Sequence, residues 1–111
     1  MFQVIEIRQF IDRRGQNPFG RWFERLNAEA QAKVTTSLDR LERGNFSAVK
    51  SVGAGVFELR LDFGPGYRIY FGKDGETVVI LLGGGTKKRQ QSDIAAATGL
   101  WRQYKQQKRE E

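Results

Sequence analysis

Cysteine and histidine are both absent from the 111 residues of the chain. Without cysteine, the chain can form no disulfide, no thiolate nucleophile and no zinc–sulfur site. Without histidine, it lacks the commonest general base and the commonest metal ligand. We therefore expect no metal and no cofactor, and we expect any acid–base chemistry to use Lys, Arg, Tyr, Asp or Glu.

Long apolar runs are absent as well. No stretch approaches the roughly 20 residues that span a bilayer. The first ten residues, MFQVIEIRQF, also lack the basic and apolar regions of a secretion signal. We therefore expect a cytoplasmic protein with no membrane partner. Neither a G-x-x-x-x-G-K-[ST] phosphate loop nor a G-x-G-x-x-G helix start occurs, which argues against a nucleotide cofactor.

The residues that are present suit one small folded domain over 1–111. Hydrophobic residues make up 39% and aromatic residues 12% of the chain, enough to build a core. We expect the charged tail, 105–111, to fray. The net charge is +6, and residues 49–111 carry +4 of it, because 11 Lys and Arg there face 7 Asp and Glu. This excess suits an anionic partner without selecting one.

The first half of the sequence predicts a strand followed by two helices. Residues 2–7 are partly alternating and β-branched, as in a short strand. Asn17 and Pro18 are typical of a helix cap and first turn. Apolar side chains then follow helical spacing in two adjacent segments, which should pack as an antiparallel hairpin, and Gly44 ends the second. These side chains are Phe19, Trp22, Phe23 and Leu26, then Ala30, Val34, Leu38 and Leu41.

The second half predicts three strands in succession. Residues 56–63 alternate, with Phe and Leu on one face and charged side chains on the other. The turn Gly64-Pro65-Gly66 leads to a strand at 67–71, whose Tyr67 and Tyr70 should face opposite sides and serve in packing. A hairpin turn near 73–75 then leads to an apolar strand at 77–82, which we expect at the centre of the sheet.

A last helix completes the predicted order, β-α-α-β-β-β-α. Gly83-Gly84-Gly85 is expected to break the chain, and Ser92 to cap a short helix with Ile94, Ala97, Trp101 and Tyr104 inward. This order predicts an α+β fold with the helices on one side of a mainly antiparallel sheet.

Several cations are predicted to lie on the polar face of this sheet. If the three later strands are neighbours, their open face gathers basic side chains that can bind phosphate oxygens. The alternative is a solvated face whose cations pair with Glu58 and Asp62. The candidates are Lys50, Arg60, Arg68, Lys87, Lys88 and Arg89.

Three runs resemble the RelE/HigB/ParE superfamily of type II toxins, and in particular its phage-derived, Gp49-like branch of addiction module killer proteins. They are RLERGNF at 40–46, VKSVGAGVFELRLDFGPGYRIYF at 49–71 and LLGGGTKKRQQSDI at 81–94. The combination of GPGYR with a later GG-x-K-x-x-Q segment is the most specific part. WFERL at 22–26 and the last helix fit too, so the resemblance covers nearly the whole chain.

The resemblance implies a small RelE-like fold and a metal-independent endoribonuclease that cleaves mRNA on the ribosome. It implies that Arg68 stabilises the charge that develops on the scissile phosphate, and that Arg60 faces the same phosphate. Lys87 would stabilise the phosphate or the leaving group. Lys50, Lys88 and Arg89 would bind RNA. The implied partners are mRNA, the ribosome and a cognate antitoxin of the helix-turn-helix, HigA-like kind.

The chain departs from this pattern at the general base. Glu58 stands where ribosome-dependent members carry a lysine, and Gln91 or Asp93 stands where some carry a tyrosine. Glu58 is a candidate base, since a carboxylate can accept the proton of a 2′-hydroxyl. The alternative is an exposed glutamate paired with Arg60 or Lys87.

Two other functions stay open. A ParE-like inhibitor of DNA gyrase would share the fold without the RNA-cleaving cations. A non-catalytic relic would only bind its antitoxin or RNA.

Overall fold

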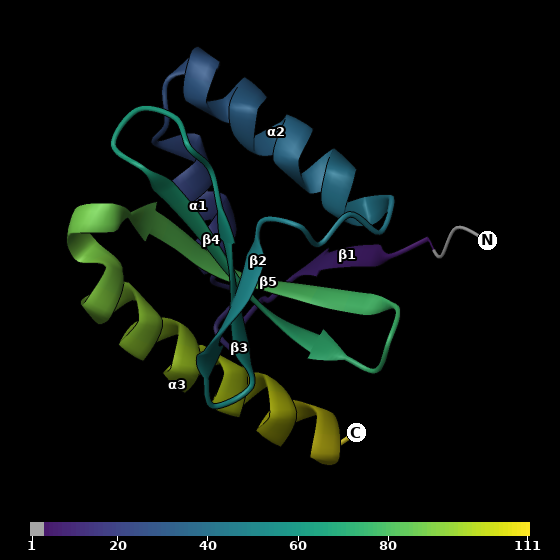
Figure 1. Ribbon diagram of the computed structural model, residues 1–111. Coiled ribbons are helices and arrows are strands. Elements are labelled where there is room, and N and C mark those ends of the chain that lie inside the picture. Colours follow the sequence, from purple (N-terminus) through teal and green to yellow (C-terminus); the bar gives the residue numbers. More distant parts are fainter. Residues whose placement is uncertain (1–3) are drawn as a thin grey trace.

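A five-stranded sheet forms the centre of the molecule in a computed structural model that describes residues 4–111. The strand order is β1-β5-β4-β3-β2, and only the β1–β5 pair is parallel. The predicted mainly antiparallel sheet and α+β class are confirmed (Figure 1). The strands are β1 (Glu6–Gln9), β2 (Val49–Gly53), β3 (Val56–Arg60), β4 (Tyr67–Asp74) and β5 (Val78–Thr86).

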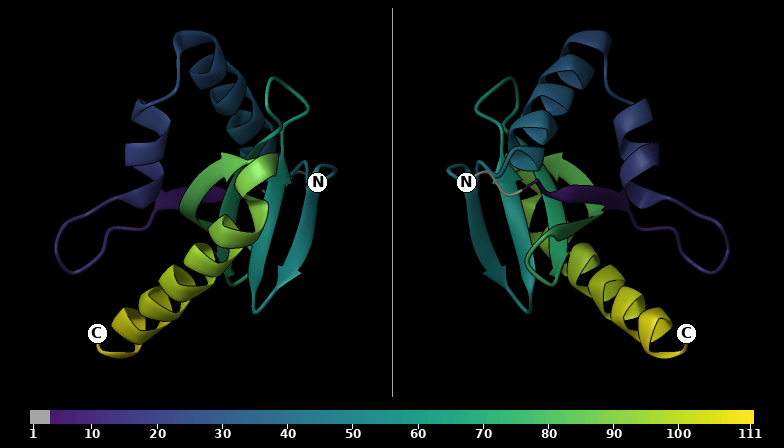
Figure 2. Two further views of the ribbon diagram at one scale, coloured as in Figure 1. Left: turned by 90° about the vertical axis from the view of Figure 1, so that its left-hand side faces the viewer. Right: turned by 90° about the vertical axis from the view of Figure 1, so that its right-hand side faces the viewer.

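Asparagine side chains start the first two helices. In α1 (Pro18–Glu24), Asn17 accepts a hydrogen bond from the Gly20 N–H at 2.9 Å. In α2 (Ala28–Glu42), Asn27 accepts one from the Ala30 N–H at 2.8 Å. Each cap satisfies an N–H that has no partner inside its helix, so the predicted start of α1 is confirmed. The helices diverge from their connection in a V shape (Figure 2).

Helices cover both faces of the sheet, which corrects the predicted one-sided arrangement. On one face, α1 and α2 pack against Ile69, Phe71 and Leu81. On the other, α3 (Gln90–Arg109) packs against Tyr70, Ile80 and Leu82 (Figure 2). The central strands β4 and β5 are buried on both sides, so their apolar residues do not alternate with polar ones.

The last helix is longer than predicted. After the short 3₁₀ turn η1 (Lys87–Arg89), α3 runs for 20 residues. Ser92 does not cap it, because its hydroxyl donates to the Arg89 carbonyl from within the first turn. The predicted frayed tail is helical through Arg109. Among the helices of residues 4–111, none is both long and apolar enough to cross a membrane.

Strand limits also differ from the prediction. The first strand begins at Glu6, and the predicted position Phe2 lies outside the described residues. Strand β2 was not predicted. The predicted strand 56–63 ends at Arg60. The triple glycine does not break the chain, because β5 continues through it to Thr86.

Two glycines in the sheet make room for the two tryptophans. A Cβ on Gly84 would lie 2.4 Å from the Trp22 indole, and a Cβ on Gly72 would lie 2.4 Å from the Trp101 indole. Each indole therefore rests directly on the backbone of the sheet, Trp22 on one face and Trp101 on the other. The glycines are needed here for close approach rather than for turning.

Candidate active site

Glu58 and Arg68 form a buried ion pair under the start of α3. Their side chains are 1% and 8% exposed, and Arg68 Nε lies 3.5 Å from Glu58 Oε1. Arg68 Nη1 also donates to the Gly66 carbonyl at 3.1 Å, which fixes the guanidinium against the turn. Burying two charges is costly unless each is paired and hydrogen-bonded, so this pair is unusual for a small core.

The register of the sheet explains why these side chains meet. Glu58 pairs with Tyr70 across β3 and β4, and Arg60 pairs with Arg68. Directly opposed residues in an antiparallel ladder share a face, so all four face α3. The first turn of α3 then covers Glu58, as the Gln90 side chain donates to Glu58 Oε2 at 2.7 Å.

Four buried polar atoms around this pair have no hydrogen-bond partner within residues 4–111. They belong to different residues of one cluster, and no other such side-chain atom occurs in the described chain. Asp93 joins the cluster because its carboxylate packs on Gly85, the ladder partner of Arg68. Buried polar groups in folded proteins are nearly always satisfied, so this concentration points to a site that takes up water or a ligand. The atoms are Glu58 Oε1, Arg68 Nε, Tyr70 Oη and Asp93 Oδ2.

Tyr70 and Asp93, the other two residues of the cluster, both have raised pKa values. Burial raises the pKa of Tyr70, and the negative charges of Glu58 and Asp93 raise it further. Burial also raises the pKa of Asp93, which the positive charge of Arg89 partly offsets. Tyr70 is therefore a hydrogen-bond donor at neutral pH and not a base.

A small pocket gives access to Glu58 from the β2 side. Its volume is about 130 Å³, several times the roughly 30 Å³ that one water occupies. Lys50 and Arg60 line it with side chains 63% and 55% exposed, and Lys50 Nζ lies 3.9 Å from Glu58 Oε1. This carboxylate oxygen, which accepts no hydrogen bond, thus lies between an exposed lysine and a buried guanidinium. Ser47, Ala48 and Val49 complete the pocket.

Comparison with known proteins places these residues in a family. The family model described as "Phage derived protein Gp49-like (DUF891)" matches residues 21–101, which include the whole cluster. The chain belongs to the Gp49-like family. An uncharacterized protein of Haemophilus influenzae is 46% identical over 80 residues, which cover 71% of this chain and 81% of that protein. No solved structure matches the chain.

The Gp49-like fold brings together only some of the cations predicted from sequence. Arg60 is exposed, and its Nε lies 3.5 Å from Asp62. Lys87 is exposed too, and its Cβ and Arg68 Nη1 both lie against Gly66. Lys88 and Arg89 belong to η1. Arg89 lines a different groove, of about 450 Å³, between α1 and the start of α3, which also contains Arg21 and Arg25.

The expected open polar face is wrong, because α3 covers it. Glu58 is therefore not an exposed glutamate paired with Arg60 or Lys87, and Arg68 is not a surface cation. Tyr70 faces the side opposite Tyr67, as predicted, and packs in the core. The position of Tyr70 beside Glu58 and the partial burial of Asp93 were not predicted. The only signal for Asp93 was its place in the LLGGGTKKRQQSDI run.

Proposed function

We propose that this Gp49-like protein is the toxin of a type II toxin–antitoxin system and acts as a metal-independent endoribonuclease on translated mRNA. The observation that carries the proposal is Glu58 Oε1, which accepts no hydrogen bond, lies 3.5 Å from Arg68 Nε and 3.9 Å from Lys50 Nζ, and belongs to a side chain that lines a pocket with Arg60. A carboxylate among cations suits phosphoryl transfer that uses neither histidine nor metal. Family membership and the toxin-like motifs support the same assignment.

The proposed step is an intramolecular displacement at phosphorus. Glu58 accepts the proton of the 2′-hydroxyl, the O2′–P bond forms, and the P–O5′ bond breaks. Lys50 and Arg60 bind the non-bridging oxygens, and Arg68 stabilises the negative charge that builds up on them. We assign Lys87 the donation of a proton to the departing O5′; Glu58 then loses its proton to solvent, and Lys87 regains one from it. The products are a 2′,3′-cyclic phosphate and a 5′-hydroxyl end, so the 2′-hydroxyl and not water is the nucleophile.

Two side chains are assigned positioning roles. Tyr70 is the ladder partner of Glu58 and stays protonated, so its hydroxyl can donate to the carboxylate once substrate reorders the pocket. Gln90 holds the other oxygen of Glu58. Because Gln90 occupies Oε2, Oε1, which accepts no hydrogen bond, is the oxygen that we assign as the base. Lys88 and Arg89 extend the cationic surface along η1 for longer RNA.

The proposed partners follow from the family resemblance. A cognate antitoxin of the helix-turn-helix, HigA-like kind would neutralise the toxin, and the ribosome would present the mRNA. Acidic antitoxin segments would be attracted to the exposed Lys50, Arg60 and Lys87.

The test is cleavage in a bacterial translation extract, with mRNA 5′ ends mapped by primer extension. Wild type is compared with Glu58→Gln, Lys50→Gln and Arg60→Gln, each checked for folding. Arg8→Gln is the control, because Arg8 is an exposed cation on β1, at the other edge of the sheet from β2. We expect cuts in codon register on translated message. The cuts should fall by about 10²–10³-fold when one charge-stabilising group is removed, and Arg8→Gln should leave them unchanged.

Other outcomes are equally informative. Cuts on naked RNA would keep the nuclease and remove the ribosome from the proposal. An absence of cuts with every form of RNA would overturn the nuclease, and a gyrase cleavage-complex assay would then test the ParE-like alternative. A protein that binds its antitoxin but neither cleaves RNA nor poisons gyrase would be the relic.

A further inference from the structure

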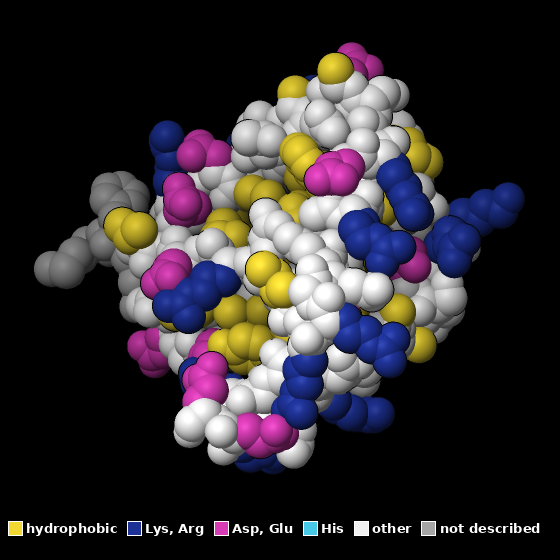
Figure 3. Space-filling model, turned by 180° about the vertical axis from the view of Figure 1, so that it is seen from behind, with side chains coloured by type: hydrophobic (Ala, Val, Ile, Leu, Met, Phe, Trp, Pro, Cys, Tyr) yellow, Lys and Arg dark blue, Asp and Glu magenta, His cyan; other side chains and the backbone are white. Residues whose placement is uncertain are grey.

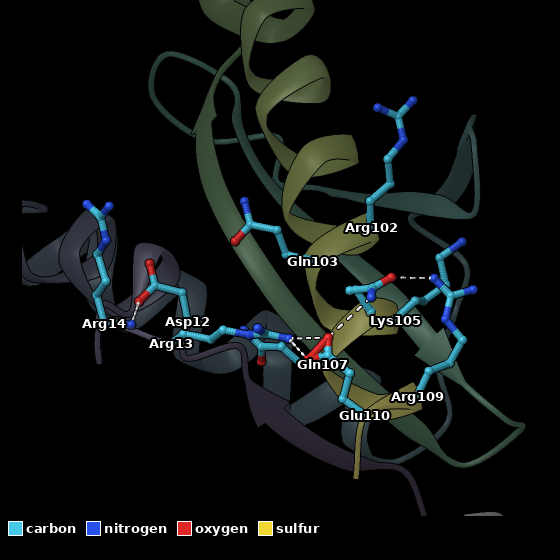
Figure 4. A pocket seen from close by; sticks show the side chains of 10 residues that line it. Asp12, Arg13, Arg14, Arg102, Gln103, Lys105, Gln107, Arg109 and Glu110 are labelled. Carbon is cyan, nitrogen blue, oxygen red and sulfur yellow. Dashed lines mark hydrogen bonds and ion pairs between the residues drawn. The ribbon is translucent and has the colours of Figure 1, made fainter.

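A further groove lies between the loop before α1 and the C-terminal half of α3 (Figure 4). Its volume is about 700 Å³. The side of the molecule that carries η1 and α3 is rich in Lys and Arg (Figure 3). The groove is lined by Asp12, Arg13, Arg14, Arg102, Gln103, Lys105, Gln106, Gln107, Arg109 and Glu110.

The groove has an excess of positive charge that the protein itself does not neutralise. Five of its lining residues are cations and two are acids. Asp12 is engaged by the backbone N–H groups of Arg14 and Gln16, at 2.8 and 2.9 Å. Glu110 is engaged by Arg13 at 2.5 Å. Within residues 4–111, the remaining four cations have no acidic partner; they are Arg14, Arg102, Lys105 and Arg109.

The side chains that line the groove indicate the kind of partner that it binds. Every side chain that lines the groove is charged or an amide. Protein–protein interfaces are built around apolar and aromatic anchors, which this groove does not offer. Interfaces with nucleic acid are polar and strongly positive, with Arg, Lys and Gln donating to phosphate oxygens. We propose that this groove binds the phosphate backbone of an RNA strand, as a contact separate from the candidate active site.

Its position separates it from the proposed chemistry. Gln90, which touches Glu58, and Arg102 are twelve residues apart on α3, or about 18 Å at 1.5 Å per residue. All the lining residues also lie outside 21–101, the stretch that the Gp49-like family model matches. The groove is therefore built from the two ends of this chain and not from the part it shares with the family.

Glu110 acts as a built-in competitor for the phosphate. Its carboxylate binds Arg13 through both oxygens (Figure 4). The Gln106 amide donates to the same carboxylate at 3.2 Å. This ion pair is exposed to solvent, which screens the attraction between its charges, so a phosphate can displace Glu110 at little cost. Glu110→Gln releases Arg13 and removes one negative charge from the groove.

The test measures binding of a labelled 20-nucleotide single-stranded RNA by fluorescence anisotropy over a salt series, in a Glu58→Gln background that prevents cleavage. We expect Arg102→Gln/Arg109→Gln to weaken binding, and to lower the slope of log K against log salt by about 0.7 per lost phosphate contact, or about 1.4 for two. Glu110→Gln should bind more tightly. The control is Arg8→Gln/Arg43→Gln, which removes the same charge from exposed sites on β1 and beside α2.

Equal affinity and equal slope in the groove variant and the control variant would overturn the proposal. Binding of poly-L-glutamate in place of RNA would also overturn it, in favour of an acidic protein partner. The translation-extract assay, run on the same groove variant with Glu58 intact, separates this inference from the proposed function. Weaker RNA binding and a lower salt slope in Arg102→Gln/Arg109→Gln support the groove whether or not message is cut, whereas an absence of cleavage by wild type overturns only the proposed function.

Discussion

At the scale of single residues, burial of the Glu58–Arg68 pair lowers stability but leaves two polar atoms able to interact with a substrate. A folded core normally satisfies its polar atoms, yet one oxygen and one nitrogen of this pair lack hydrogen bonds. The low dielectric around them strengthens any interaction with an incoming phosphate. The same surroundings make each charge depend on the other for stability.

Removing one partner should therefore be costly. Arg68→Ala should lower the free energy of unfolding by about 3–5 kcal/mol, because it leaves an uncompensated buried carboxylate. Arg60→Ala, which removes an exposed guanidinium from the opposite ladder position, should change it by no more than about 0.5–1 kcal/mol. Urea unfolding followed by circular dichroism measures both. Equal effects of the two variants would show that the Glu58–Arg68 pair is not isolated from solvent, and that Arg68→Ala is a usable activity variant.

At the scale of elements, the triple glycine of β5 illustrates how neighbouring positions differ. Gly84 lies under the Trp22 indole, whereas nothing lies within 4 Å of the place where a Cβ on Gly83 would be. Neither residue has the positive φ that would require glycine. Packing alone therefore decides which of the two accepts a side chain.

The paired substitutions test this difference. Gly84→Ala should destabilise the protein by about 1–3 kcal/mol, because the methyl group overpacks the contact between β5 and α1. Gly83→Ala should be neutral or stabilising by up to about 1 kcal/mol, since it only restricts the unfolded chain. Thermal denaturation of the two variants provides the measurement. A larger loss in Gly83→Ala than in Gly84→Ala would contradict the packing described for Trp22.

The elements also show what local sequence can and cannot predict. Asn17 and Pro18 marked the start of α1 because capping depends on adjacent residues. Strand β2 was not predicted because Lys50 and Ser51 are both polar and exposed. The segment therefore lacks the alternation of apolar and polar residues that would indicate an edge strand. The two-residue alternation correctly placed Glu58 and Leu59 on different faces of the sheet. It does not reveal that α3 covers the face that carries Glu58. Burial is a tertiary property, so the sequence pointed to Glu58 and Arg68 but neither to the cover that α3 gives them nor to Tyr70 and Asp93 beside them.

At the scale of the whole molecule, the absence of histidine and cysteine leaves a wide range of pH in which few groups change charge. The groups whose titration affects stability change charge at acid pH and at alkaline pH. Tyr104 donates to Asp74 at 2.5 Å, and Lys108 pairs with the same carboxylate, so α3 is tied to the end of β4. Lys108 and Tyr104 hold the pKa of Asp74 below its usual value. Burial and Asp74 raise the pKa of Tyr104 to about 12.

These shifts predict stability that is level from about pH 7 to 9 and falls on either side. On the alkaline side, the contribution of Tyr104 is fully present below about 10, its unfolded pKa, and is lost as pH rises through about 12. On the acid side, the contribution of Asp74 is present above its unfolded pKa of about 4 and is lost as pH falls through its lower folded pKa.

Urea midpoints from pH 3 to 11 measure this profile. Tyr104→Phe should be less stable than wild type at pH 8, and should lose less further stability between pH 9 and 11. An unchanged alkaline slope in Tyr104→Phe would show that the phenol of Tyr104 does not titrate with unfolding.

The two tryptophans on opposite faces of the sheet also equip the protein with separate optical probes. Trp22 belongs to the layer of α1 and α2, and Trp101 to the layer of α3. With Trp22→Phe, tryptophan emission comes only from the α3 side, and with Trp101→Phe it comes only from the opposite side. Stopped-flow tryptophan emission from such single-tryptophan chains would reveal whether the two layers assemble on the sheet in one event or in sequence, and whether RNA perturbs only one of them.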